Sequence, residues 1–216
     1  MPGRLTLGRL HQEILGCRRC LEAGLLPRAV PILPAPIPSR IVLVGQAPGR
    51  VEEDAGRPFS GRAGRQLFRW LAEAGFGDEE SARRTVYLTS ITKCYPGPAL
   101  SGSGDRRPGP REVELCRGHL EQQLALLRPW LILAVGQMAA ERFLGPRAMH
   151  RTVGRVFSSS GVELALAQGR PARGWPLVMP LPHPSGASRW LNLAEHRGLL
   201  AQALAVLRRL AAPDPG

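Results

Sequence analysis

Four cysteines are the residues of this 216-residue chain whose spacing most directly suggests chemistry. Cys17 and Cys20 form a C-x2-C pair, and two further thiols follow at Cys94 and Cys116. Such a set favours metal binding over a disulfide in a cytosolic chain. Two metal interpretations stay open, because structural zinc usually has two close pairs, whereas an iron–sulfur cluster itself spans the thiolates and accepts looser spacing. Cys116 also falls on an apolar helical stripe, where it could be an ordinary core residue.

A second candidate region runs from Gly45-Gln46-Ala47-Pro48-Gly49 through the acidic Glu52-Glu53-Asp54 to Gly56-Arg57-Pro58-Phe59. Small residues directly after a strand let the backbone approach a ligand closely. Phe59 could stack on a base, although an aromatic taken alone is more often a core residue than a stacking platform. Later in the chain, Pro182-His183-Pro184-Ser185 places an imidazole after another apolar run.

The elements that must position these residues alternate between strands and helices. Short apolar runs predict buried strands at Arg40–Gly45, Thr85–Ser90, Trp130–Gly136 and Pro176–Leu181. Helical periodicity predicts helices at Leu5–Arg19, Gly61–Gly75, about 111–128, Gln137–Leu144 and Asn192–Leu210, and residues 152–166 suggest a hairpin. In the last helix we expect the inward positions to be Leu193, Leu200, Leu204 and Leu207.

This alternation predicts an α/β fold, a three-layer α/β/α sandwich around a mostly parallel sheet. We expect a single domain over residues 1–216, with a proline-rich connector at about 27–39 and a metal-binding subregion built from 17–20 and 94–116. Ligands of such sheets bind beyond the carboxyl ends of the strands. Chemistry is therefore expected in the loops Gln46–Phe59, Ser90–Pro110 and His183–Asn192.

The charge balance indicates a polyanionic partner. The formal net charge is +12, almost entirely from arginine, with Lys93 the only lysine. Neutralising phosphates releases counterions, which favours nucleic acid as the partner, and a merely soluble basic surface is the alternative. No apolar run approaches the roughly 18 residues of a membrane span. Charged residues interrupt the first segment, which differs from a secretory signal, so we expect a cytoplasmic monomer.

Taken together, these segments resemble the iron–sulfur uracil-DNA glycosylases, the class called family four. That class reads Gly-Glu-Ala/Gly-Pro-Gly, an acidic stretch, Gly-Arg-Pro-Phe and Gly-x-Ala-Gly, which Gly45–Gly64 matches closely. The Lys93-Cys94 ending, the Glu112-Val113 segment before Cys116 and the His183 motif match in order. The resemblance implies a [4Fe–4S] cluster held by Cys17, Cys20, Cys94 and Cys116.

The resemblance also implies a function. The chain is expected to be a monofunctional DNA glycosylase that flips out uracil and hydrolyses its N-glycosidic bond, acting on DNA that contains a deaminated base. By the same resemblance, His183 donates a hydrogen bond to uracil O2, where negative charge develops. Phe59 stacks on the flipped base, and the backbone amides of Gln46 and Ala47 hold the base and a water.

The chain departs from the family pattern at two of these positions. Gln46 stands where the class has glutamate, and an amide can orient water but cannot accept its proton. Glu52 is the expected substitute carboxylate in the catalytic set of His183, Gln46 and Glu52. Ser90 stands where the class has asparagine, so we expect relaxed specificity, with hypoxanthine and xanthine as further substrates.

DNA-binding residues are expected in two loops. The segment after the histidine motif supplies Ser185 and the wedge candidates Arg189, Trp190 and Leu191; the alternative for Trp190 and Leu191 is that they begin the packed face of the last helix. The Arg106-Arg107 pair could contact phosphates or be simply solvated. Two other functions stay open: a non-catalytic iron–sulfur nucleic-acid binder on the same fold, and a zinc protein with unrelated chemistry.

Overall fold

A four-stranded parallel sheet forms the centre of the molecule. The computed structural model describes residues 5–100, 104–164, 176–185 and 189–212. The strands β1 (Ile41–Gly45), β2 (Tyr87–Ser90), β3 (Leu131–Val135) and β4 (Leu177–Leu181) are arranged in the order β2-β1-β3-β4. Every pair is parallel, with Gly45 beside Ser90 and Val135 beside Leu181. All four strands lie within the predicted apolar runs.

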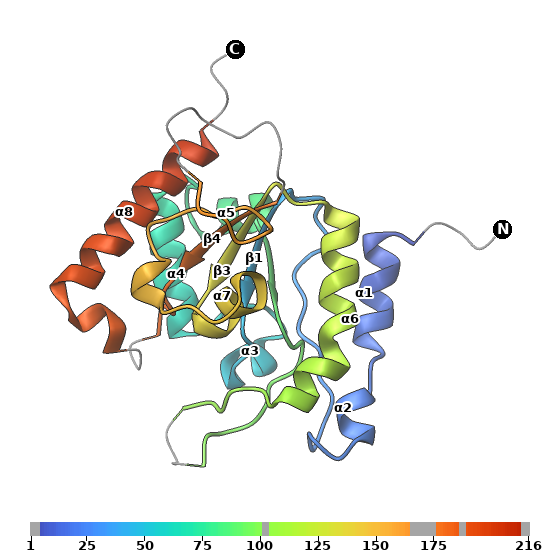
Figure 1. The fold of residues 1–216 in the computed structure, drawn as a ribbon. Helices are drawn as coiled ribbons and strands as arrows, with labels where there is room; N and C mark the ends of the chain where they lie inside the picture. Colours follow the sequence, from blue (N-terminus) through green and yellow to red (C-terminus); the bar gives the residue numbers. More distant parts are fainter. Residues whose placement is uncertain (1–4, 101–103, 165–175, 186–188, 213–216) are drawn as a thin grey trace.

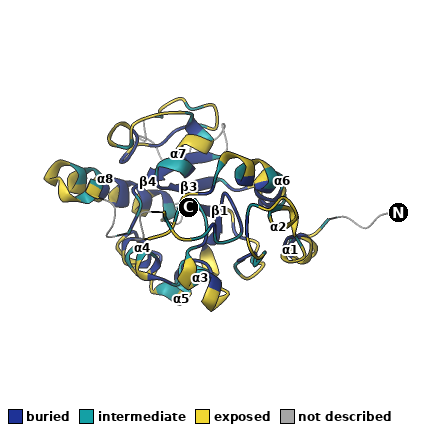
Figure 2. Cartoon of the chain, turned by 90° about the horizontal axis from the view of Figure 1, so that it is seen from below, coloured by how far each residue is buried: buried dark blue, intermediate teal, exposed yellow. Residues whose placement is uncertain are grey.

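Helices cover both faces of this sheet (Figures 1 and 2). The described helices comprise α1 (Leu7–Leu15), α2 (Arg19–Glu22), α3 (Arg50–Ala55), α4 (Arg62–Glu73), α5 (Glu79–Thr85), α6 (Pro110–Leu127), α7 (Gln137–Leu144) and α8 (Ala194–Ala211), with short 3-10 turns at Met149–Arg151 and Arg189–Asn192. None of them is both long and apolar enough to span a bilayer within the described ranges.

Successive strand residues feed two separate apolar cores, because side chains alternate between the faces of a sheet. Leu43 packs with α4, α5 and α8, whereas its neighbours Val42 and Val44 pack with α6 and α7 on the opposite face. Each core has its own helical layer. The predicted three-layer α/β/α fold is therefore confirmed.

Several boundaries differ from the sequence-based expectation. The first helix was expected to reach Arg19 but ends at Leu15, because Gly16 caps it and bonds back to Gln12 O, and a separate α2 follows. The hairpin expected at 152–166 is present but short in its described part: the Ser158 N–H donates to the Val162 carbonyl, the Leu164 N–H donates to the Val156 carbonyl, and Phe157 forms an antiparallel bridge to Glu163. Leu193 was expected to face inward, yet it is the N-cap of α8 and 56% exposed.

Two short helices were missed because they carry little apolar periodicity. α3 lies inside the expected Gln46–Phe59 loop, and α5 precedes β2 with Ala82 as its buried residue. Local polar contacts stabilise α5 instead: Asp78 caps its first turn through a 2.8 Å bond from Ser81 N, and acidic and basic residues occupy opposite ends. Charge and capping patterns, not hydrophobicity, were the available signals.

Candidate functional site

The carboxyl ends of all four strands open into one cavity of about 520 Å³, here called the strand-end cavity. The segments after β1 and β2 contribute Gln46, Ala47 and Ser90, and the segment after β4 contributes His183. Phe59 lines the same cavity, although it is distant in sequence from His183. Parallel strands bring these loops to one edge of the sheet, as the topology requires.

His183 is held in a defined tautomer by its own loop. The Ser185 backbone N–H donates to Nδ1 at 3.2 Å, and the Ser185 hydroxyl lies 2.9 Å from the same nitrogen. Burial lowers the pKa of His183, and the positive charge of Arg107 lowers it further. The imidazole is therefore neutral near pH 7, and because Nδ1 accepts, its proton lies on Nε2. His183 offers a neutral N–H donor.

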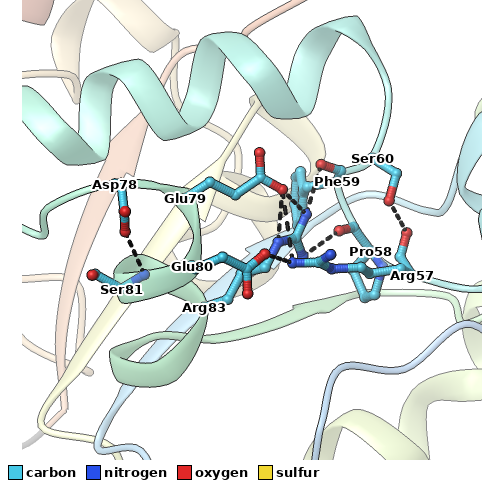
Figure 3. Close-up of polar contacts among 9 residues, drawn as sticks. All are labelled: Arg57, Pro58, Phe59, Ser60, Asp78, Glu79, Glu80, Ser81 and Arg83. Atoms are coloured by element: carbon cyan, nitrogen blue, oxygen red, sulfur yellow. Dashed lines mark hydrogen bonds and ion pairs between the residues drawn. The ribbon is translucent and has the colours of Figure 1, made fainter.

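The backbone of Phe59 is fixed by contacts that leave little freedom. Phe59 has a positive φ of 55°, a conformation that non-glycine residues rarely adopt. Arg83 donates to the carbonyls of Pro58 and Phe59 at 2.8 and 3.1 Å (Figure 3). A Cβ on Gly64 would lie 1.8 Å from the Phe59 carbonyl oxygen, so only glycine fits there.

The ring of Phe59 lies over the end of β1. A Cβ on Gly45 would come 3.0 Å from the edge of the Phe59 ring, so glycine at this position leaves room for the ring to pack against the end of β1. Both features lie in the Gly45–Gly64 segment that the sequence singled out. The structure thus presents an anchored aromatic at the wall of the strand-end cavity.

Glu52 lines the cavity, but backbone groups already engage its carboxylate. Its Oε2 accepts the Gly49 N–H at 3.0 Å, and its Oε1 accepts the Gly61 N–H at 2.9 Å. The side chain therefore ties the start of α3 to the start of α4 on either side of the acidic stretch. The structure gives Glu52 a bracing role; its predicted catalytic role stays a prediction.

Ser90 is buried at the end of β2 and also lines the cavity. Its hydroxyl donates to the Thr92 carbonyl at 2.7 Å. A hydroxyl has one proton, so the Ser90 oxygen retains only acceptor capacity toward a ligand. The backbone carbonyl of Gln46 accepts a hydrogen bond from the Thr92 N–H at 3.1 Å.

The two predicted DNA-contacting arginines occupy different environments. Arg106 binds Glu112 through both terminal nitrogens, at 2.7 and 2.8 Å, and Glu112 is almost fully buried. Both arginines line the strand-end cavity, but Arg107 is exposed whereas Arg106 is half-buried. Of the pair, Arg107 is therefore the residue that the structure presents to a phosphate.

The three wedge candidates, Arg189, Trp190 and Leu191, also lie in different environments. Trp190 stacks on His196 with ring centroids 4.2 Å apart, and both Trp190 and Leu191 pack against the core. Trp190 and Leu191 belong to the 3-10 turn Arg189–Asn192 that precedes α8, so they pack against the core without starting the last helix, while Arg189 is exposed. Trp190 still lines the cavity. Residues 186–188 of this loop lie outside the described residues.

Sequence reasoning missed several contributors to this cavity. Gly136, Gln137 and Met138, which follow β3, form its fourth side. Gly136 has a φ of 85°, and a Cβ there would lie 3.3 Å from the His183 ring. Asp105 lines the cavity as a further carboxylate. The glycine directly after a predicted strand was the available signal for the β3 loop; nothing in the sequence marked Arg83.

A second, narrower cavity collects all four cysteines and is here called the cysteine cavity. Cys17 reaches it from the α1–α2 turn, Cys20 from α2, Cys94 from the segment after β2, and Cys116 from α6. No disulfide joins them. Burial raises the pKa of Cys94 to about 12, and the neighbouring Cys116 and Cys20 also raise it. The predicted subregion of 17–20 and 94–116 is therefore brought together in space.

Two cationic side chains, Lys93 and Arg19, also line the cysteine cavity. Lys93 is almost fully buried, and its Nζ donates to Thr89 Oγ1 at 3.0 Å and to the Ser90 carbonyl. Lys93 is buried and Arg19 is exposed at the edge of this group of thiols, and positive charge beside four thiols suits an anionic thiolate group. Among the described residues, no group of three or more His, Cys, Asp and Glu side chains is arranged to hold a single metal ion.

Comparison with known proteins gives consistent matches. The model of a family described as the uracil DNA glycosylase superfamily matches residues 34–208. The type-4 uracil-DNA glycosylase of Archaeoglobus fulgidus is 37% identical over 136 residues, covering 63% of this chain and 62% of that protein. That of Pyrobaculum aerophilum is 34% identical over 140 residues, covering 65% of each. That of Sulfurisphaera tokodaii is 28% identical over 212 residues, covering 95% of this chain and 85% of the relative.

Proposed function

Because this chain belongs to the uracil DNA glycosylase superfamily, we propose that it excises uracil from DNA by hydrolysing the N-glycosidic bond. The observation that carries the proposal is the meeting of Phe59 and His183 in one cavity at the strand ends. A cavity of about 520 Å³ can admit a nucleobase that has been flipped out of its stack. The type-4 names of the relatives support the same activity.

In this proposal His183 stabilises the departing base. Its neutral Nε2–H donates to a base carbonyl oxygen, on which negative charge grows as the glycosidic bond lengthens. The donor is fixed in advance by Ser185, so the site needs no reorganisation when the charge develops. One such preorganised donor typically lowers a barrier by about 2.7–4 kcal/mol.

Phe59 supplies the stacking surface for the base. Base–aromatic stacking contributes about 1–3 kcal/mol per base. Since Arg83 and Gly64 fix the backbone of Phe59, the ring stands ready before DNA binds. Preorganisation of this kind lowers the entropic cost of gripping an extruded base.

In this proposal the turn after β1 positions the attacking water. Gln46 orients a water through its amide, and Glu52 acts as a positioning residue that holds the Gly49 and Gly61 amides in place. Residue 46 cannot take the proton of the water, which passes to the departing base anion or to solvent as the C1′–O bond forms and the N-glycosidic bond breaks, so leaving-group stabilisation by His183 carries most of the catalysis.

Ser90 selects the substrate class. Its oxygen can accept a hydrogen bond but cannot donate one, because its proton is bound to the Thr92 carbonyl. Uracil and hypoxanthine present a ring N–H, whereas cytosine and adenine, the bases they arise from, present an unprotonated ring nitrogen at the corresponding position. An acceptor at this place therefore favours uracil over cytosine and hypoxanthine over adenine; it does not separate xanthine from guanine, because both carry a ring N–H.

DNA contact in this proposal comes from Arg107 at the cavity mouth and from the segment that contains Ser185 and Arg189. The basic surface adds sequence-independent attraction to phosphates, consistent with the +12 net charge. Trp190 serves as a cavity wall beside the base, since its stacking on His196 holds it in place.

The cysteine cavity fits a [4Fe–4S] cluster held by Cys17, Cys20, Cys94 and Cys116. The cavity gathers four unbridged thiols with the cationic Lys93 and Arg19, which suits an anionic four-thiolate group. When bound, the cluster supplies a cross-link that ties the α1–α2 turn, the segment after β2 and α6 together. Arg106, just before α6, is then held against that helix through Glu112.

A panel of oligonucleotides tests this function. Holo-protein in excess is mixed with strands carrying one uracil, hypoxanthine, xanthine or mispaired thymine, and abasic sites are revealed by alkaline cleavage. We expect cleavage at uracil and slower cleavage at the deaminated purines, with a large loss for His183→Ala. Binding of every strand without any abasic site would instead establish the non-catalytic binder.

A further inference from the structure

Two buried polar atoms in the cysteine cavity have no hydrogen-bond partner among the described residues. They are the hydroxyl of Thr92 and Nε2 of His119. Thr92 is 5% exposed and His119 is 7% exposed, and both residues line the cavity alongside the four cysteines. Buried polar groups of folded proteins are almost always paired, so each unpaired one calls for a partner.

Other buried polar side chains near the cysteine cavity have hydrogen-bond partners. His11 Nε2 lies 2.6 Å from the Tyr87 hydroxyl, which also accepts from Gln123 at 2.6 Å. Thr89 donates to Gln123 at 3.1 Å and accepts from Lys93. This buried chain of hydrogen bonds runs next to the cysteine cavity and satisfies its members. The unpaired atoms are therefore confined to the surface that faces the thiols.

We infer that His119 and Thr92 donate hydrogen bonds to the sulfur atoms of the iron–sulfur cluster, an inference that rests on the proposed cluster. Thiolate and sulfide sulfurs accept hydrogen bonds and donate none, so they complement an N–H and an O–H. An imidazole can carry a proton on Nε2 and the Thr92 hydroxyl carries one, so each of the two unpaired atoms can act as a donor. Both residues are positioning residues for the cluster.

The two donors approach from different elements. His119 lies on α6 one turn after Cys116, and Thr92 precedes Cys94 in the segment after β2. Each donor thus accompanies a cysteine of its own segment. Hydrogen bonds to cluster sulfurs raise the reduction potential, because they stabilise the more negative reduced state. In this inference His119 and Thr92, which are not cluster ligands, help to set the reduction potential of the cluster.

Paired variants separate a hydrogen bond from mere packing. His119→Leu and Thr92→Val remove the donors, whereas His119→Gln and Thr92→Ser retain an N–H and an O–H. The reduction potential is measured on intact, cluster-loaded protein. We expect each donor-deleting variant to lower the potential, so that the ratio of reduced to oxidised cluster at a fixed applied potential falls about tenfold. The donor-retaining variants should restore most of that ratio.

His11→Leu is the matched control, because His11 is a buried imidazole of the same region whose partner is Tyr87. It should reduce thermal stability while leaving the potential of the loaded protein unchanged. If His119→Leu and Thr92→Val retain the wild-type potential, or if His11→Leu shifts it equally, the inference is wrong. A purified protein without iron or visible absorption would overturn the cluster and this inference together, while uracil excision could still be intact.

Discussion

The strand-end cavity and the cysteine cavity lie on either side of one short segment, yet they are built on different principles. Thr89 and Ser90 face the first, and Thr92, Lys93 and Cys94 face the second. The strand-end cavity is framed by the ends of four hydrogen-bonded strands and braced by backbone contacts. The cysteine cavity is framed by the α1–α2 turn, α6 and a loop. The first is complete as a protein structure; the second presents thiols and unpaired donors that suit a bound group.

This difference predicts where each kind of damage will appear. Changes in the strand-end cavity should alter the reaction while the fold persists. Changes in the cysteine cavity should alter the fold, and the reaction only through it. Changes in the shared segment from Thr89 to Cys94 should affect both the reaction and the stability of the fold.

The largest effect is expected for Cys116→Ser. Serine removes a thiolate from a buried position on α6, so we expect loss of the visible absorption and of iron. The melting temperature should fall by on the order of 10 °C, the shift that a loss of a few kcal/mol gives in a chain of this size. Iron analysis and thermal unfolding measure both. A variant that keeps its iron and its melting temperature would show that Cys116 is an ordinary core residue.

His183→Ala should have the opposite signature. We expect the single-turnover rate of uracil excision to fall about 10²–10³-fold, because one preorganised donor to the leaving base is lost. Iron content and melting temperature should stay at the wild-type values. A matched Ser185→Ala change removes the hydroxyl but keeps the backbone N–H on Nδ1, so its rate should fall much less. Equal losses in the two variants would contradict the assigned tautomer.

Arg83→Met tests the support of Phe59. Arg83 donates to two backbone carbonyls and pairs with Glu79, so we expect a loss of about 1.5–3 kcal/mol in the free energy of unfolding and weaker retention of the base. Arg84→Met is the control, because the neighbouring Arg84 is exposed and bonds the Ser81 hydroxyl. Denaturant unfolding compares the pair. Similar curves for the two variants would refute the proposed clamp.

The smallest expected effect is a shift in pH dependence. His183 has a lowered pKa, so its neutral form persists below the ordinary histidine pKa and is lost only as the pH falls through the lowered value. Arg107 contributes to that lowering, so Arg107→Gln should move the acidic fall in single-turnover rate to higher pH. The rate near pH 8 at saturating protein should change little. A shift to lower pH would contradict the sign of this interaction.

The sequence predicted the frame of the strand-end cavity well, because buried parallel strands appear as apolar runs and parallel topology brings their ends together. Phe59 and His183 were identified by motif resemblance and meet in the same cavity. The wall after β3 and the Arg83 clamp were missed. A glycine with positive φ and an arginine bound to backbone carbonyls leave no pattern in hydrophobicity, since their partners are distant or are not side chains.

The cysteine cavity was predictable in a different way. Spacing alone left zinc and iron–sulfur open, and the resemblance assigned the four thiols to one group. The meeting of these thiols depends on how the α1–α2 turn packs against α6, which no local pattern encodes. His119 had no motif to mark it, and its relevance follows from its burial and its unpaired nitrogen.

The central claim is that Phe59 and His183 act on the same extruded base. A double-mutant cycle tests it most directly, with single-turnover uracil excision measured for wild type, Phe59→Ala, His183→Ala and the double variant. If both side chains hold one base, their effects are coupled, so the double variant should lose less than the product of the two single losses. Losses that multiply fully would show that the two residues act independently and would contradict the account.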